Sequence, residues 1–413
     1  MRTLRQEGFE ALWAGGCVRD QLLGRTPKDY DVASTATPDE VIRIFGRRST
    51  VSVGASFGVI MVIGPDKAAG QVEVATFRSD GEYMDGRRPS SVRFCRPEED
   101  ARRRDFTING MFFDPLDETL LDYVGGRSDL AQGIVRAIGD PVARFTEDKL
   151  RMLRAVRFTA TFGFVLDSAT ADAARQLRQQ LNQVSVERIA QELKRMLSQT
   201  TRERSFHLLA RVELLPEVLP EIFPAGSMDG GKLASVGQML RHLTSERFEP
   251  ALALILKICL YDASEKESTT TIESVCRRLK LSNEETSCIS WLAGSLLVLA
   301  DIRDKPLHVR KPLLAHPHFE LLLEMSAAIA AAENRIATDV EFCRAYLSSL
   351  QGKELCPSPL IDGQDLFDLN VPQGPAFRTL LSAIREEQLD EILTTRTAAL
   401  ERLRELVNAG TVE

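Results

Sequence analysis

The chain has 413 residues, more than one hydrophobic core ordinarily supports, so we expect two or more domains. Its composition, with 44% hydrophobic and 27% charged residues, is that of a soluble globular protein. The net charge of −7 argues against nucleic-acid binding over the whole surface, although arginines cluster within the first 160 residues and can line a basic cleft.

No apolar run reaches the ~18 residues of a membrane span, and residues 1–15 lack the apolar core of a signal peptide. We therefore expect a cytoplasmic protein without a membrane partner. The seven cysteines show no C-x-x-C spacing, which indicates neither a zinc site nor a disulfide framework.

The first informative element is a glycine turn. Gly15 and Gly16 are expected to open a strand-turn-helix element that carries Arg19. Glycine lets backbone amides approach a phosphate closely, and an arginine can bind the phosphate charge. By itself, a Gly-Gly turn is more often only structural.

Two aspartates, Asp29 and Asp31, follow this turn one residue apart. On an extended strand alternate side chains share a face, so both carboxylates would point to one place. Mg2+ prefers oxygen ligands and is often shared between protein carboxylates and nucleotide phosphates. Such pairs also occur in solvated loops, but beside the glycine turn this pair predicts Mg2+-dependent phosphoryl or nucleotidyl transfer.

Up to about residue 138 the apolar residues alternate, which predicts a mixed α and β domain. A helix is expected over residues 37–45, with Thr37 as its cap and Pro38 in its first position. Glu73 lies alone between valines, either as an outward-facing strand residue or as a third catalytic carboxylate beside Asp29 and Asp31. The expected strands cover residues 51–53, 58–63, 71–76 and 91–94.

The next polar cluster is a basic triplet, residues 102–104, that leads into Asp105. A basic triplet is usually a solvated surface. Here the neighbouring apolar residues Phe106 and Ile108 disfavour a solvent-exposed segment. Arginine side chains suit triphosphate oxygens, and a carboxylate suits ribose hydroxyls.

From Asp140 onward the apolar period becomes 3.6, which predicts a helical extension with breaks at 224–231 and 357–363. A helix is expected over residues 146–158, with Thr146 as its cap. Asp148 and Arg151 would then share a face, where an acceptor and a donor can bind the edge of a base. An ordinary charged helix gives the same pattern.

Five ordered motifs resemble those of the class II tRNA nucleotidyltransferases and bacterial poly(A) polymerases, within the polymerase-β-like nucleotidyltransferase superfamily. They lie at residues 15–20, 29–31, 103–109, 122–130 and 147–154. Residues 363–375 resemble the family's C-terminal segment, whereas residues 200–350 match only in helical character.

The resemblance implies an α+β fold. A polymerase-β-like nucleotidyltransferase head, with a mixed sheet and helices, would cover residues 1–138. A helical neck with the base-recognition helix would follow over 139–205, then a helical, RNA-binding body over 206–350 and a helical tail over 351–413.

The resemblance also implies a reaction. The 3′-hydroxyl of tRNA would attack the α-phosphate of CTP or ATP and release pyrophosphate, with neither a nucleic-acid template nor a DNA partner. Asp29 and Asp31 would bind the catalytic Mg2+, and Gly16 and Arg19 would contact the triphosphate. The implied nucleotide-binding residues are Gly15, Gly16, Arg19, Arg104, Asp105, Asp148, Arg151, Arg154 and Arg157.

Within this set, Arg104 and Asp105 would hold the triphosphate and the ribose. Asp148 and Arg151 would act as a protein template for the base, while the arginines at positions 154 and 157 support the nucleotide.

Three features favour CCA addition within this family. Residues 54–57 lack the basic pair of the poly(A) polymerases, and the C-terminal end is not basic. Residues 79–89 resemble the flexible loop of full CCA-adding members, which CC-adding members lack. An A-adding, CC-adding or poly(A)-adding enzyme remains the alternative.

Two other readings are less favoured. None of the five histidines precedes an aspartate, so a second, His-Asp phosphohydrolase activity is not expected. A binding-only descendant should have lost a metal carboxylate or the Asp148–Arg151 pair, and this sequence keeps both.

Overall fold

The computed structural model describes residues 1–54, 58–64, 70–80, 92–224, 229–261, 263–350 and 354–408. Residues 55–57 and 81–91, which hold most of the segments used above to choose within the family, lie outside this description, and so does the end of the chain from residue 409. In the described residues no helix is long and apolar enough to cross a membrane. The cytoplasmic location stays a prediction.

Contacts between residues divide the chain into two compact units. The first comprises Met1–Leu233 and Arg277–Leu281, and the second comprises Ala234–Cys276 and Ser282–Glu413. The finer division into head, neck, body and tail stays a prediction.

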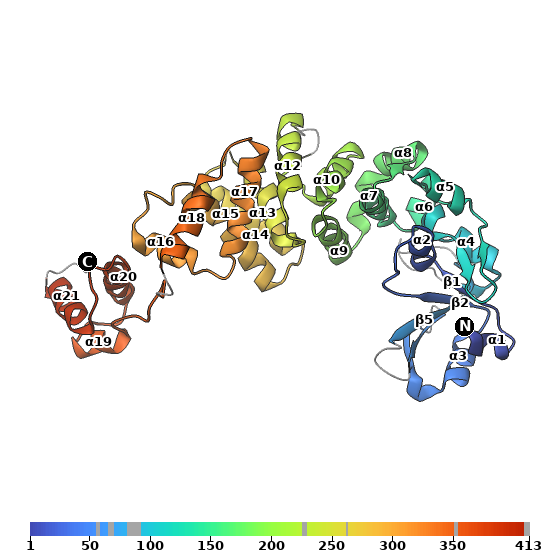
Figure 1. Cartoon of the computed structure of the whole chain (residues 1–413), viewed down its shortest axis with the longest axis horizontal. Helices are drawn as coiled ribbons and strands as arrows, with labels where there is room; N and C mark the ends of the chain where they lie inside the picture. Colours follow the sequence, from blue (N-terminus) through green and yellow to red (C-terminus); the bar gives the residue numbers. More distant parts are fainter. Residues whose placement is uncertain are drawn as a thin grey trace. The chain divides into compact units, whose positions relative to one another are not determined.

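A seven-stranded mixed sheet forms the centre of the head (Figure 1), with the strand order β3-β4-β5-β2-β1-β8-β9. Only β2 and β5 run parallel among these neighbours, which confirms a mixed sheet. The strands are β1 (Ala11–Ala14), β2 (Asp31–Ser34), β3 (Thr50–Gly54), β4 (Val59–Ile63), β5 (Gln71–Thr76), β8 (Phe112–Asp114) and β9 (Thr119–Leu121).

Two smaller sheets stand apart from it. The strand expected over 91–94 forms as β7 (Val92–Phe94), but it pairs with β6 (Arg78–Asp80) and not with the main sheet. The other joins β10 (Ile134–Val135), near the end of the expected head, in parallel with β11 (Val165–Leu166), which lies in the region expected to be helical.

Helices cover both faces of the main sheet because adjacent residues of β2 enter different cores. Val32 packs with Leu4 and Val41, whereas Ala33 packs with Ala101 on the other face. The helices of the head are α1 (Arg2–Gln6), α2 (Gly16–Leu22), α3 (Pro38–Phe45), α4 (Pro97–Arg102) and α5 (Gly126–Gln132), with 3-10 turns at Arg47–Ser49 and Thr107–Asn109.

The cap expected for α3 is confirmed. Thr37 is the residue before the first helical position, Pro38, and the carboxylate of Glu40 accepts a hydrogen bond from the backbone N–H of Thr37 at 2.8 Å.

Apart from β11, the regular elements of the described chain beyond the head are helices, as expected. In the first unit the helices are α6 (Pro141–Glu147), α7 (Arg151–Phe162), α8 (Ser168–Leu177), α9 (Val186–Leu197), α10 (Arg202–Arg211) and α11 (Leu215–Val218), with a 3-10 turn at Arg178–Gln183. They are followed by α12 (Gly230–His242), α13 (Phe248–Cys259), α14 (Glu265–Arg278), α15 (Asn283–Ala300), α16 (Leu307–Leu314), α17 (Phe319–Ala332), α18 (Thr338–Ser349), α19 (Gly363–Asp368), α20 (Pro375–Leu389) and α21 (Arg396–Asn408).

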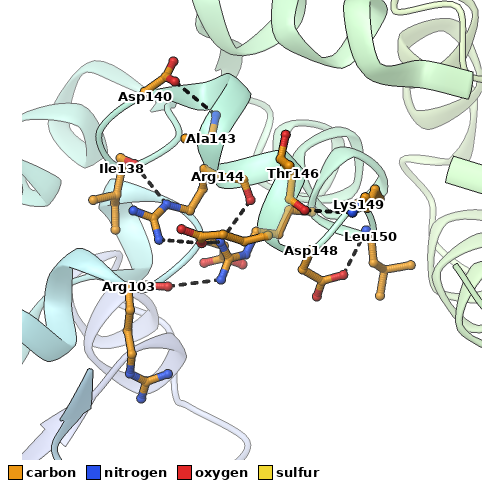
Figure 2. Close-up of polar contacts among 12 residues, drawn as sticks. Arg103, Ile138, Asp140, Ala143, Arg144, Thr146, Asp148, Lys149 and Leu150 are labelled. Atoms are coloured by element: carbon orange, nitrogen blue, oxygen red, sulfur yellow. Dashed lines mark hydrogen bonds and ion pairs between the residues drawn. The ribbon is translucent and has the colours of Figure 1, made fainter. Parts of the chain in front are cut away.

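The prediction of a single helix over 146–158 is wrong, because the chain forms two helices, α6 and α7, that are separated by residues 148–150. Asp140 caps the first, α6. Its carboxylate accepts a hydrogen bond from the backbone N–H of Ala143 at 3.1 Å (Figure 2) and another from that of Val142 at 3.3 Å. Thr146 lies inside α6 and does not begin a helix.

Asp148 ends α6 with an extended backbone, at φ −141° and ψ 104°. Its carboxylate accepts the backbone N–H of Leu150 at 3.1 Å, a local turn that competes with helix formation. Nζ of Lys149 donates to the carbonyl of Thr146 at 2.8 Å, which satisfies a carbonyl near the end of α6. Figure 2 shows both contacts.

A tight contact fixes the 3-10 turn at Thr107–Asn109. A Cβ on Gly126 would lie 2.2 Å from the carbonyl oxygen of Thr107, so only glycine lets α5 come this close. Oγ1 of Thr107 donates to Asp129 of the same helix at 2.7 Å. The turn is therefore held by α5 from one side.

Candidate active site

A pocket of about 480 Å³ in the first unit gathers most of the residues expected to bind a nucleotide. Six arginines line it against three aspartates, which confirms a basic cleft in an acidic chain. The lining residues are Gly15, Gly16, Arg19, Asp31, Arg103, Arg104, Asp105, Asn109, Asp148, Leu150, Arg151, Arg154, Phe158 and Arg188. Among the expected site residues, Asp29, Glu73 and Arg157 lie outside this lining.

The glycine turn has the geometry expected from the sequence. β1 ends at Ala14, Gly15 has a positive φ of 73°, and α2 begins at Gly16. A Cβ on Gly15 would lie 2.9 Å from Nη1 of Arg104, so the glycine also leaves room for that guanidinium.

Arg19 is held at the pocket from several sides. Its Nε and Nη2 donate to Asp20 at 2.8 and 2.7 Å, and its Nη1 donates to Oδ1 of Asn109 at 2.7 Å. The guanidinium also lies over the ring of Phe162, 4.4 Å from its centre.

Asp31 and Glu73 lie side by side, because they are register partners on the parallel strands β2 and β5. Partial burial raises the pKa of Asp31, and the negative charge of Asp29 raises it further, while Arg104 opposes both effects. Partial burial also raises the pKa of Glu73, as do the charges of Asp31 and Asp29. These carboxylates repel one another, and a divalent cation would relieve that repulsion.

The strand begins at Asp31, so Asp29 lies in the segment before it and the alternation of a strand does not extend to Asp29. Among the residues that the structure describes, no group of three or more carboxylate, histidine or cysteine side chains has the arrangement of a metal site. The role of Glu73 as a third catalytic carboxylate stays a prediction.

The arginines of the basic triplet lie in two different surroundings. Arg102 is solvent-exposed and pairs with Glu98 at 2.7 Å. Arg103 and Arg104 both bind the buried carboxylate of Asp100, at 2.6 and 3.0 Å. Burial alone would raise the pKa of Asp100, but the two guanidinium groups outweigh it and the pKa is lowered.

Asp105 is buried and accepts four hydrogen bonds. Its Oδ1 accepts from the backbone of Phe106 at 2.8 Å and from Nδ2 of Asn109 at 3.0 Å. Its Oδ2 accepts from Nε and Nη2 of Arg154 at 2.9 and 2.5 Å. Burial alone would raise the pKa of Asp105, but Arg154 and Asn109 outweigh it and lower the pKa to about 2.

This lowered pKa predicts that stability depends on pH in acid. Because the folded pKa lies below that of the unfolded chain, Asp105 stabilises the fold above about pH 4, and its contribution is lost as the pH falls toward 2. The contribution is about 2 kcal/mol. Urea unfolding between pH 6 and 3 should show a shallower loss of stability for Asp105→Asn than for the parent chain; equal slopes would contradict the prediction.

Arg151 is oriented by the end of α6. Its Nη1 donates to Oε2 of Glu147 at 2.7 Å and to the carbonyl of Arg144 at 3.1 Å, and its Nη2 donates to the carbonyl of Arg103 at 3.1 Å. Arg144 also donates to Glu147, at 2.8 Å, and to the carbonyl of Ile138, at 3.2 Å (Figure 2). The guanidinium is therefore fixed by three acceptors around it.

Asp148 pairs with Arg188 of α9, with contacts of 3.2 and 2.8 Å. The sequence reasoning missed Arg188, because nothing in the amphipathic pattern of α9 separates it from an exposed arginine. Arg157 lies behind the lining, where its Nε donates to Glu192 at 2.6 Å and its guanidinium lies 4.2 Å from the centre of the Phe158 ring.

Known protein families match two parts of the chain that contribute residues to the pocket. Residues 11–136 match the poly(A) polymerase head domain, and residues 163–225 match the probable RNA and SrmB-binding site of polymerase A. The CCA-adding enzyme of Geobacillus stearothermophilus is 42% identical over 215 residues, 52% of each chain. That of Leuconostoc mesenteroides is 42% identical over 216 residues, again 52% of each chain. The chain thus matches about half the length of these curated relatives.

Solved structures extend the likeness to the whole chain. A crystal structure of the Bacillus stearothermophilus CCA-adding enzyme in complex with CTP has a TM-score of 0.76 at 29% identity, over 99% of this chain and 97% of that one. The Thermotoga maritima CCA-adding enzyme complexed with tRNA_CCA has a TM-score of 0.64 at 20% identity, over 98% and 93%, which shows a common fold.

The mixed-sheet head, the helical remainder and the pocket in the first unit define the class of polymerase-β-like nucleotidyltransferase folds. Within that class, the chain is similar to the class II CCA-adding enzymes and bacterial poly(A) polymerases, through the two family matches and through its likeness to CCA-adding enzymes over about half of its length.

Proposed function

We propose that the chain adds CMP and AMP, from CTP and ATP, to the 3′ end of tRNA without a nucleic-acid template. One observation supports this more than any other. A single pocket brings together the glycine turn, Asp31, the arginines expected to bind the triphosphate, and both Asp148 and Arg151. These residues come from four separate segments of the sequence.

Asp29 and Asp31 are the residues that would hold Mg2+, and the mutual repulsion of Asp29, Asp31 and Glu73 fits a divalent cation. When bound, the cation supplies positive charge for the triphosphate and favours the deprotonated form of the attacking hydroxyl.

The arginines of the pocket orient the triphosphate. Arg19 and Arg104 are each fixed by a neighbouring aspartate, Asp20 and Asp100, so their guanidinium groups are set in direction before a phosphate arrives. The carboxylate of Asp105 accepts a hydrogen bond from a ribose hydroxyl. Together they hold the α-phosphorus for in-line attack, so that positioning and charge provide most of the catalysis.

The base is read by Asp148 and Arg151. Cytosine and adenine both carry an exocyclic amine, from which the carboxylate of Asp148 can accept a hydrogen bond. Uracil and guanine carry a carbonyl at the corresponding place, which has no hydrogen to donate. Arg151 donates to ring acceptors. Because Arg188 and Glu147 fix these two side chains, the choice of nucleotide is made by groups whose orientation is set by the protein.

The helices beyond the neck would hold the acceptor end of tRNA by its shape and backbone, as is usual for structured RNA. The match of residues 163–225 to a probable RNA-binding segment supports an RNA partner.

Three tRNA transcripts test the reaction, ending before the CCA, after the first C and after both cytidines. With CTP and ATP together, all three should be completed to CCA and no further, which sequencing of the products will show. Addition of A only to the last transcript would indicate an A-adding enzyme, arrest after two cytidines a CC-adding enzyme, and long A tracts a poly(A) polymerase. No addition to any transcript would overturn the proposal.

A further inference from the structure

A small cavity lies between α13, α14 and α15 of the second unit. Its volume is about 20 Å³, which leaves room for a single water molecule or a monatomic ion. The polar side chains that line it are Lys257, Glu265, Ser268, Thr269 and Ser290. None of them lines the nucleotide pocket, and the proposed reaction uses none of them.

Lys257 is a charged residue in an otherwise apolar stretch of α13. The helix buries every residue from Pro250 to Leu256, and Lys257, which follows directly, is itself only 9% exposed. Within the described part of the chain, no group accepts a hydrogen bond from its ammonium or forms an ion pair with it. An ammonium has three donors and no acceptor, and a buried charge without a partner is costly. The buried ammonium therefore requires an acceptor, and one with negative charge suits it best.

Ser290 offers a second donor to the same cavity, from α15. Its Oγ is buried and has no hydrogen-bond partner among the described residues. Small residues beside it, Ala293 and Gly294, also line the cavity, and a Cβ on Gly294 would meet no atom within 4 Å. The ammonium of Lys257 and the hydroxyl of Ser290 thus line one cavity from two helices, and both can donate into it.

The charges around the cavity favour an anion. A cation would be repelled by the ammonium of Lys257, and a water molecule would leave that charge uncompensated. Glu265 is the carboxylate of the lining, but it is solvent-exposed and forms no ion pair with the described side chain of Lys257, so water screens its charge. Phosphate and sulfate are too large for this volume. A single monatomic anion fits both the size and the charge of the site.

We propose that this cavity binds a halide ion, chloride in ordinary solution. The ion accepts hydrogen bonds from Nζ of Lys257 and from Oγ of Ser290, and so joins α13 to α15. By supplying the missing negative charge, it stabilises the folded second unit. The inference does not depend on the reaction proposed above, so either can fail without the other.

The unfolding temperature of the full chain, in sodium chloride and in sodium gluconate at equal ionic strength, tests the proposal. Gluconate is too large to enter the cavity. Because a ligand that binds only the folded state stabilises it, the parent chain should unfold about 2–4 °C higher in about 200 mM chloride than in gluconate. Lys257→Met keeps a long side chain without its charge and should abolish this difference.

Lys311→Met is the matched control. Lys311 is also buried, at 5% exposure, but its Nζ donates to the carbonyl of Leu389 at 2.7 Å and to Oε1 of Glu391 at 2.9 Å. This ammonium has protein acceptors and does not line the cavity. Its loss should lower the unfolding temperature in both salts and keep the difference between them.

Bromide allows the ion to be located directly, because its anomalous X-ray scattering distinguishes it from water. Crystals of the parent chain soaked in sodium bromide should show a bromide peak within hydrogen-bond distance of Nζ of Lys257 and Oγ of Ser290. Density without an anomalous signal would mean a bound water and would overturn the proposal. A bromide peak without a chloride response in solution would mean binding at crystal concentration only, and would overturn it too.

Ser290→Ala replaces the lysine variant if that one fails to fold. It removes one donor and leaves the charge, so the chloride concentration that gives half of the stabilisation should rise about fivefold. A parent-like response to chloride in a folded Lys257→Met or Ser290→Ala chain would contradict the assignment of the site.

Discussion

Replacing both Asp29 and Asp31 by asparagine is expected to lower the rate of CMP and AMP addition to tRNA by on the order of a thousandfold or more. The substitutions keep the size of both side chains but remove the charges that would hold Mg2+. Incorporation of labelled CTP and ATP into tRNA that lacks its 3′ end measures the effect.

Asp117→Asn is a suitable control, because Asp117 also lies in the head and pairs with Arg5, but its side chain is 65% exposed and does not line the pocket. It should leave incorporation unchanged. The metal site would be refuted if a double variant with the same unfolding temperature as the parent chain incorporated the nucleotides at an undiminished rate.

Asp148→Ala is expected to lower the preference for CTP and ATP over UTP and GTP by about 10- to 100-fold. A good pair of contacts to a base edge provides about 1–3 kcal/mol of discrimination. The substitution also leaves Arg188 without the carboxylate that it binds at 2.8 Å. Competition between the four nucleotides, followed by sequencing of the added residues, measures the loss.

The control for this variant is Asp172→Ala. Asp172 pairs with an arginine too, Arg175 on the same helix α8, but it is 70% exposed. Its loss should leave nucleotide choice intact. Selection that survives in Asp148→Ala would mean that another group reads the base.

The sequence predicted local features where the chemistry is local. The turn at Gly15, the cap at Thr37 and the strands over residues 58–63 and 71–76 follow from short-range patterns, and the structure has each of them. The sequence reasoning missed the helix boundary at Asp148. Asp140 with Pro141 is a helix start of the same kind as Thr146, and the structure uses the earlier one, so that the helix that begins there ends before Asp148.

Partners from distant segments were beyond single-sequence reasoning. Asn109 joins Asp105 to Arg19, which is 90 residues away, and Arg188 binds the carboxylate of Asp148 from 40 residues away. Each is an ordinary polar residue in its own segment. Only the packing of α4, α7 and α9 around the pocket gives these residues a specific task.

The direct pairing of Asp31 with Glu73 across β2 and β5 has a consequence for how this chain tolerates change. A shift of β5 by one residue would turn Glu73 into the core that Val74 now fills with Leu4 and Val41, and would bring a valine beside Asp31. Insertions or deletions within this strand would therefore damage folding and chemistry in a single event. Length variation in related sequences should accordingly be absent from β5 itself and confined to the segments that flank it.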